Sequence, residues 1–188
     1  MKVAITGHTQ GIGKAIFDEL ARRSYQVRGY SRSNNWDIMS LEIRNKILEE
    51  TFDFDVFINN AYCPVAQFEL LKSVVAHWQG TKKLIVNVGS KSIYADVVPD
   101  FMQDYVKDKQ QQLEFINSRR LQARPHILNV TLGLVDTQMS KNLLAEKLDV
   151  ADVASTLINL IEIKDQIYVQ DLMLDVPFQD WSVIKVIS

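Results

Sequence analysis

Short apolar runs alternate along the chain with longer amphipathic segments. Runs rich in β-branched residues predict strands at residues 3–6, 26–30, 55–58, 83–88, 126–131 and 167–174. Apolar residues that recur every three or four positions predict helices beginning near Gly11 and over residues 41–50, 68–78, 99–120 and 149–161. The pattern therefore repeats strand, helix and strand along most of the chain.

This alternation predicts an α/β protein of three layers, in which a doubly wound, mostly parallel sheet of about six strands has helices on both faces. The run Val56-Phe57-Ile58 is wholly apolar, as expected of a strand covered on both sides. The 188 residues have the length of one domain, so we expect a single Rossmann-type domain over residues 1–188. The tail after Asp175 fits no element, and we expect an edge strand or a strap across the surface.

The sharpest local feature is a glycine-rich turn directly after the first strand, which reads Thr6-Gly7-His8-Thr9-Gln10-Gly11-Ile12-Gly13. Gly7 permits a sharp turn, Gly11 leaves room for a phosphate at the helix N-terminus, and Gly13 lets the helix pack closely on the strand. The unpaired amides and the dipole of the helix favour a diphosphate at this point. The turn therefore predicts nucleotide binding.

The composition narrows the function classes. Lysine and arginine number 21 and aspartate and glutamate 23, for a net charge of −2. We therefore expect no nucleic-acid partner, because such proteins usually carry a basic excess. No apolar run reaches the ~18 residues of a membrane span, and the first residues read as a strand rather than a signal peptide. With one cysteine and three scattered histidines, we expect a cytoplasmic protein with no disulfide and no metal site.

Further motifs follow the turn in order. They are Asn59-Asn60-Ala61 after the third strand, Val86-Asn87-Val88-Gly89-Ser90 at the end of the fourth, Tyr105 with Lys109 four positions on, and Val135-Asp136-Thr137 after the fifth. Together with the Gly-x3-Gly-x-Gly spacing, they make residues 6–137 resemble the short-chain dehydrogenase/reductase family. The resemblance implies an oxidoreductase that reduces a carbonyl, or oxidises an alcohol, by hydride transfer with a nicotinamide cofactor.

Tyr105 and Lys109 are the candidate catalytic pair, because a spacing of four places them on one face of a helix. A nearby ammonium favours the phenolate, which suits a general acid or base near neutral pH. The resemblance implies that Tyr105 exchanges a proton with the substrate oxygen, that Lys109 holds the ribose hydroxyls and lowers the tyrosine pKa, and that a serine binds the carbonyl. Ser90 fits the strand end of the family and is preferred, whereas Ser92 has the commoner 13-residue gap to Tyr105.

The end of the second strand bears on the choice of cofactor. Family members that prefer NAD(H) have an acidic residue there, whereas this chain reads Gly29-Tyr30-Ser31-Arg32-Ser33. Arg32 can pair with a 2′-phosphate, so we expect NADP(H) rather than NAD(H). The resemblance implies cofactor contacts from Gly7, Thr9, Gln10, Gly11, Ile12, Gly13, Ser31, Arg32, Asp37, Ile38, Asn60, Ala61, Tyr62, Lys109, Val135 and Thr137.

The chain is shorter than most members of the family. Residues 13–37 leave almost no room for a further helix and strand, and one helix stands between residues 61 and 83 where two are expected. The substrate-covering lid after Thr137 is reduced to a short segment.

Two further departures concern the site itself. The asparagine of the catalytic tetrad has no clear match, although Cys63 falls near its place, and Tyr62 stands where the family usually has glycine. These departures keep a second function open, that of an NADP(H)-binding sensor or partner-binding module with little catalysis. For the enzyme, we expect a small-molecule carbonyl or alcohol substrate and a homodimer or homotetramer paired through the Tyr105 helix.

Overall fold

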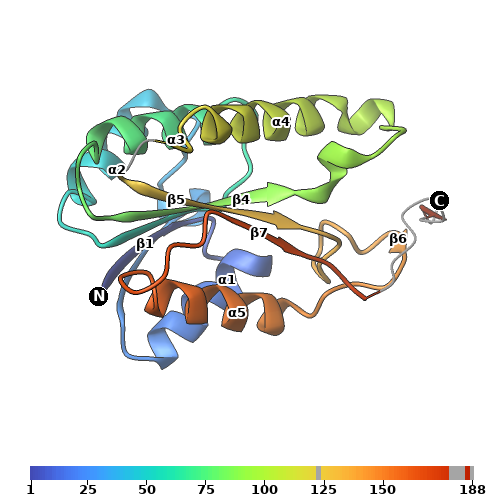
Figure 1. Ribbon diagram of the computed structural model, residues 1–188. Helices are drawn as coiled ribbons and strands as arrows, with labels where there is room; N and C mark the ends of the chain where they lie inside the picture. Colours follow the sequence, from blue (N-terminus) through green and yellow to red (C-terminus); the bar gives the residue numbers. More distant parts are fainter. Residues whose placement is uncertain (122–123, 178–184, 187–188) are drawn as a thin grey trace.

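The computed structural model describes residues 1–121, 124–177 and 185–186. Its centre is a six-stranded sheet in the order β2-β1-β3-β4-β5-β7, in which every neighbouring pair is parallel (Figure 1). The strands are β1 Lys2–Thr6, β2 Gln26–Tyr30, β3 Val56–Asn59, β4 Leu84–Ser90, β5 His126–Leu132 and β7 Asp171–Leu174. The predicted α/β fold is confirmed.

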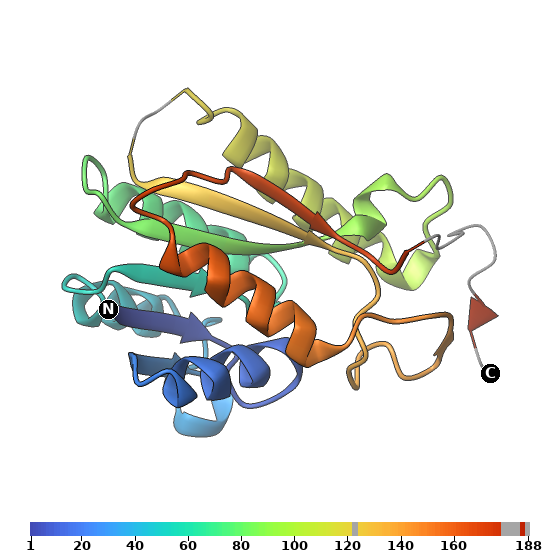
Figure 2. The same ribbon diagram turned by 60° about the horizontal axis from the view of Figure 1, so that its bottom comes forward.

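Helices cover both faces of the sheet (Figures 1 and 2). On one face lie α1 Gly11–Arg22 and α5 Val150–Glu162, and on the other lie α2 Leu41–Glu50, α3 Ala66–His77 and α4 Gln103–Asn117. Alternate strand residues point to opposite faces, so β4 sends Val86 toward α1 and α5 and Ile85 toward the other layer. The two apolar layers are separated by the sheet.

Two predicted elements are shorter in the structure. The helix expected over residues 99–120 begins as a 3-10 turn, η3 Asp100–Met102, and continues as α4 only to Asn117. The strand expected over residues 167–174 begins at Asp171. The reason is Tyr168, whose hydroxyl donates to the Ile127 carbonyl at 3.0 Å and accepts from the Ile127 amide at 3.4 Å, so a side chain takes the place of the ladder at that point.

The short segment after Thr137 contains β6 Leu143–Leu144, which pairs antiparallel with β8 Lys185–Val186. That part of the tail is therefore a strand beside the shortened segment (Figure 1). Most of the remaining tail, residues 178–184 and 187–188, lies outside the described residues.

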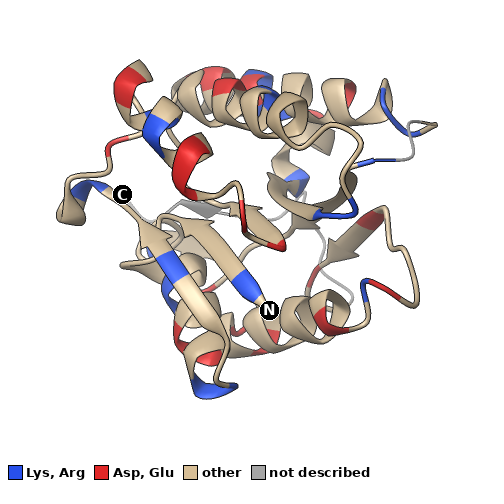
Figure 3. Cartoon of the chain, turned by 90° about the vertical axis from the view of Figure 1, so that its left-hand side faces the viewer, with Lys and Arg blue, Asp and Glu red and all other residues tan. Residues whose placement is uncertain are grey.

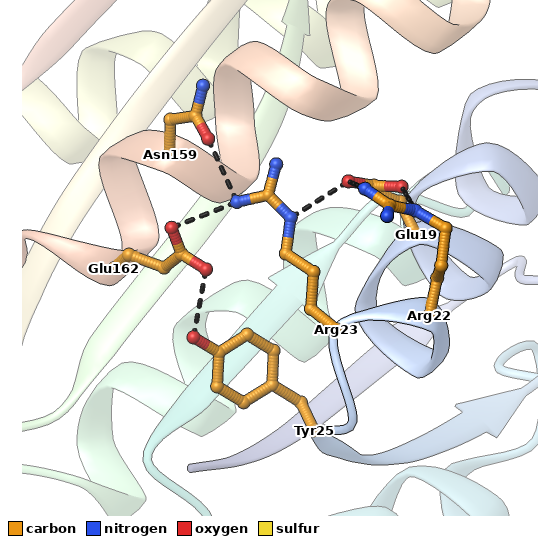
Figure 4. A network of polar contacts seen from close by, with 6 residues as sticks. All are labelled: Glu19, Arg22, Arg23, Tyr25, Asn159 and Glu162. Atoms are coloured by element: carbon orange, nitrogen blue, oxygen red, sulfur yellow. Dashed lines mark hydrogen bonds and ion pairs between the residues drawn. The ribbon is translucent and has the colours of Figure 1, made fainter.

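A polar network joins α1 to α5 at the end of α1 (Figure 4). The Arg23 guanidinium donates to Glu19, Asn159 and Glu162 at 2.8–2.9 Å. The Tyr25 hydroxyl donates to Glu162 at 2.9 Å. Hydrogen bonds from Arg22 and Arg23 lower the pKa of Glu19 to about 2. The network fixes α1, the helix that begins at the glycine-rich turn, against the neighbouring helix.

Acidic and basic residues are interspersed along the elements seen in Figure 3. Within the described ranges, no helix is both long and apolar enough to cross a membrane. In the same ranges, no three side chains of His, Cys, Asp or Glu gather as metal ligands would.

Candidate active site

The glycine-rich turn lies at the carboxyl edge of the sheet, between β1 and α1. Gly7 and Gly11 have φ angles of +73° and +53°, which side-chain-bearing residues rarely adopt. Gly13 is buried, and a Cβ there would lie 2.2 Å from the Gly7 carbonyl and 2.5 Å from the Asn60 amide nitrogen. The geometry therefore requires glycine at all three positions, for two different reasons.

The end of β3 is locked to this turn through Thr6. The Thr6 hydroxyl accepts from the backbone amides of Asn60 and Ala61 at 3.0 Å each, and the Asn60 side chain donates to the Thr6 carbonyl at 3.0 Å. Thr137 approaches from the other side, where its methyl group would lie 3.4 Å from a Cβ at Gly11. Motifs separated by up to 130 residues thus meet at one edge.

The first turn of α1 is suited to an anion. Its N-cap residue, Gln10, makes no side-chain cap, and no acidic residue lies in the first turn. By contrast, Ser40 caps α2 and Asp149 caps α5 with their side chains. An uncapped, glycine-lined helix start leaves amides and dipole available to a diphosphate. The residues present therefore fit a dinucleotide cofactor.

The other predicted cofactor residues vary in exposure. Thr9, Gln10 and Gly11 are exposed at the turn, Ile12 is half-buried against the apolar layer of α1 and α5, and Val135 is buried in it. At the end of β2, Ser31 is buried, whereas Arg32 is exposed and makes no ion pair within the described residues.

The predicted adenine-binding pair is already engaged with the protein. The Asp37 carboxylate accepts from the Met39 amide at 3.0 Å. Ile38 is buried in the layer of α2, α3 and α4, and its carbonyl accepts from Arg44 at 2.6 Å. Asp37 and Ile38 thus shape the loop after η1 Arg32–Asn34, in the place where the missing helix and strand would begin.

Ser90 ends β4 and lies beside Tyr105 on α4. Burial raises the pKa of Tyr105, and a hydrogen bond from the Ser90 side chain opposes that rise. The Ser92 hydroxyl lies 2.9 Å from the Ser90 hydroxyl, so the two candidate serines are in contact with each other. The expected lowering of the Tyr105 pKa by Lys109 is not seen in the protein alone, because burial outweighs the other effects.

Lys109, one helical turn after Tyr105, is buried. Its ammonium donates to the Val88 carbonyl at 2.7 Å and to Oε1 of Gln67 at 2.8 Å, and it lies 5.7 Å from the centres of the Tyr62 and Tyr105 rings. Burial lowers the pKa of Lys109 to about 7, with the negative charge of Asp108 opposing the change.

Tyr62 packs edge-on against Tyr105, with 4.7 Å between ring centres. Its hydroxyl lies 3.5 Å from an Asp108 oxygen, and burial and that carboxylate raise the pKa of Tyr62 to about 12. Of the two phenols next to Lys109, Tyr62 is thus held in its protonated form by an anion. Tyr105 is the one whose oxygen a neutral hydroxyl stabilises.

Gln67 is the site residue that sequence reasoning missed. It contacts Lys109 from the start of α3, whereas no described hydrogen bond joins Cys63 to that lysine. Asp37 and Arg32 influence the Cys63 thiol, whose pKa burial raises. The available signal was a glutamine among apolar helix residues, Ala66 and Phe68 being its neighbours.

No protein-family model matches the chain, and no curated protein matches it. Solved structures do. A short-chain dehydrogenase from Burkholderia cenocepacia in complex with NADP gives a TM-score of 0.74 at 18% identity, over 93% of this chain and 88% of that one. An alcohol dehydrogenase from Thermococcus sibiricus complexed with 5-hydroxy-NADP gives 0.70 at 19% identity, over 96% and 98%.

A 4-hydroxyisoleucine dehydrogenase complexed with NADH gives a TM-score of 0.75 at 17% identity, over 93% of this chain and 96% of that one. Identities this low show a shared fold. The chain therefore has the fold of short-chain dehydrogenases, as its motifs predicted.

Lys109 gives the stability of the protein a definite pH dependence. Its folded-state pKa of about 7 lies below the ordinary 10.5, so between these values the unfolded chain binds a proton that the folded chain does not. Burial of the ammonium therefore lowers the free energy of unfolding. This cost has its full size below a pH of about 7 and declines as the pH rises toward 10.5. We expect Lys109→Met to gain stability relative to the parent at the acid end, with the difference shrinking toward the alkaline end.

Urea unfolding at a series of pH values measures this difference. Lys107→Met, an exposed lysine of the same helix, is the control and should show a flat difference. A pH-independent difference for Lys109→Met would mean that the lysine keeps its ordinary pKa in the folded protein.

Proposed function

We propose that the chain is a member of the short-chain dehydrogenase/reductase family, an NADP(H)-dependent oxidoreductase that interconverts a carbonyl and an alcohol. The observation that carries the proposal is the meeting of Ser90, Tyr105 and Lys109 at the sheet edge that also bears the uncapped glycine-rich turn. A redox reaction with a nicotinamide cofactor needs a nucleotide site beside a proton-transfer site, and the candidates for both lie at this edge.

Each residue has a separate role in the reduction of the carbonyl. NADP(H), when bound, supplies or accepts the hydride. The Ser90 hydroxyl donates a hydrogen bond to the carbonyl oxygen and orients it. Tyr105 gives its phenolic proton to that oxygen, so that carbonyl, hydride and proton together yield the alcohol, and the Lys109 ammonium stabilises the phenolate that remains. In alcohol oxidation the same groups act in reverse.

The cofactor is held by groups from three elements. The α1 amides at Gly11, Ile12 and Gly13 would hold the diphosphate, and Lys109 would serve the ribose. Arg32, exposed and without an ion pair in the described part of the chain, is placed to meet a 2′-phosphate, which favours NADP(H) over NAD(H). The NADP complexes among the solved relatives support this preference, although one relative is complexed with NADH.

Replacement of Tyr105 by phenylalanine tests the chemistry. The variant keeps the ring against Tyr62 but removes the transferable proton, so NADPH oxidation with small ketones, aldehydes or quinones should slow by at least about 10²-fold. NADPH binding, followed by protein fluorescence, should be unchanged. The control is Tyr25→Phe, which alters a tyrosine bound to Glu162 in the α1–α5 network.

Should NADPH bind while Tyr105→Phe changes no rate with any compound, the alternative function applies, and the chain is a cofactor sensor. Absence of NADPH binding would contradict both functions.

Arg32 tests the cofactor preference. Arg32→Gln removes a charged donor to the 2′-phosphate, so NADPH affinity should fall by about tenfold or more while NADH affinity stays the same. Arg28→Gln is the matched control on the preceding strand β2, because Arg28 pairs with Glu50 instead. Titration of both nucleotides by calorimetry gives the two constants, and an equal loss for NADPH and NADH would overturn the assignment.

We also propose that the protein is a homodimer or homotetramer paired through α4. The outward face of this helix is polar, with exposed Gln103, Lys107, Gln110, Gln111 and Glu114. An interface here therefore relies on hydrogen bonds more than on apolar contact. We expect dimers or tetramers in sedimentation velocity at micromolar concentration, and a monomer alone would contradict the proposal.

A further inference from the structure

Lys109 is a buried ammonium held by neutral groups. Within the described residues it makes no ion pair, and its two hydrogen-bond acceptors are the Val88 carbonyl and the side-chain carbonyl of Gln67. A buried cation without strong acceptors is costly, so each of these two oxygens matters to its charge. The Val88 acceptor is a backbone carbonyl, which no substitution can remove. Gln67 can.

Gln67 is itself held in place from both ends. Its Nε2 donates to the Asn59 carbonyl at 3.0 Å, and Nδ2 of Asn59 donates to the Gln67 carbonyl at 3.3 Å. Gln67 is 1% exposed. The side-chain amide therefore has one orientation, with its oxygen toward the lysine.

Behind Gln67 runs a row of side-chain amides across three strands. Asn59, Asn87 and Asn129 are register partners in β3, β4 and β5. Asn59 donates to Asn87 at 2.9 Å, Asn87 donates to Asn129 at 3.2 Å, and Asn129 donates to the Thr131 hydroxyl at 3.3 Å. Buried amides bonded in a chain polarise one another and resist displacement. The row anchors Gln67 to the sheet.

We propose that Gln67 is a positioning residue for the reaction, whose carbonyl oxygen keeps the Lys109 side chain charged and aimed beside Tyr105. The inference rests on the proposed function for its consequence in catalysis. The contact itself stands on the geometry alone.

The surroundings of Lys109 offer its ammonium few acceptors, so one neutral oxygen should matter to its charge. The groups that face it are Tyr105 and Asp108 of α4, Tyr62 after β3, Gln67 of α3 and the Val88 carbonyl of β4. Asp108 is the carboxylate among them, and its Oδ2 is already engaged by the Val65 amide at 3.1 Å. With a pKa of about 7, the lysine is near the point where loss of one acceptor changes its charge at neutral pH.

Two substitutions with side chains of similar length distinguish the effect of the hydrogen-bond acceptor from the effect of packing. Gln67→Met and Gln67→Glu both lose the donor to the Asn59 carbonyl. Methionine also removes the acceptor, whereas glutamate keeps an oxygen and adds negative charge. We therefore expect about tenfold lower proton affinity at Lys109 in Gln67→Met and higher proton affinity in Gln67→Glu.

The probe is NMR titration of the lysine ε-carbons in the full chain without cofactor, with the Lys109 signal assigned from Lys109→Met. Gln112→Met is the control, since Gln112 is equally buried and donates to the same Gln67 Oε1 at 3.4 Å, but it offers Lys109 no described hydrogen bond. Opposite shifts in the two Gln67 variants, with a smaller change in the control, support the proposal. Equal shifts, or shifts no larger than that of the control, overturn it.

A second readout ties the contact to the reaction. In alcohol oxidation Tyr105 acts as the base, so Gln67→Met should move the rise of kcat with pH to higher pH, while the KM for alcohol changes little. If NMR shows opposite shifts but no compound is turned over, the proposed function fails and the contact stands. If turnover is found and its pH profile is unmoved in Gln67→Met, the positioning role fails.

Discussion

The candidate site depends on a buried lysine ammonium, Lys109, which makes no ion pair within the described residues. An isolated buried charge costs several kcal/mol unless hydrogen bonds replace its water shell. Here three elements meet that demand together, since α4 supplies Lys109, α3 supplies Gln67 and β4 supplies the Val88 carbonyl. The contact fixes how α3 and α4 sit on the sheet. It also places the charge within one helical turn of Tyr105, so packing and chemistry share one interaction.

Much of the fold could be predicted because its signals are local. Residues 26–30 and 41–50 match β2 and α2 to the residue, since apolar alternation and helical spacing are read within a few positions. The glycine-rich turn is also recognised within a few positions. Its glycines are needed because a Cβ at Gly7 or Gly13 would lie close to Asn60 and a Cβ at Gly11 would lie against Thr137. The start of β7 was wrong because the Tyr168 hydroxyl competes with backbone pairing, which no pattern of apolar residues reveals.

The residues of the candidate site could be predicted one by one, but most of their contacts with one another could not. Ser90, Tyr105 and Lys109 stand in motifs, but the partner of Lys109 lies 42 residues away in the chain. Asn59, Asn87 and Asn129 each interrupt an apolar strand and were visible one by one. Only strand register brings them into a row, and register is set by pairing between segments far apart in sequence. Buried polar residues within apolar strands are the signal for such a row.

Part of the shortening of the chain falls on the periphery of the sheet. The 3-10 turn η1 takes the place of a helix and strand beyond β2, and the segment around β6 is reduced. The glycine-rich turn, Asn60 and Ser90 stand at the ends of β1, β3 and β4, which are interior strands with neighbours on both sides, so losses at the edges of the sheet do not reach them.

What the lost segments would have provided is cover for the substrate. On the proposed function, that task would fall to residues between Ser90 and Tyr105, because the chain leaves the candidate site at one and returns at the other. Three exposed apolar side chains lie there, Tyr94, Val97 and Phe101. Exposed apolar groups beside a polar site bind the apolar part of a small molecule while the polar groups orient the rest. On the proposed function, substrate selectivity would thus depend less on a lid than on the short connection between Ser90 and Tyr105.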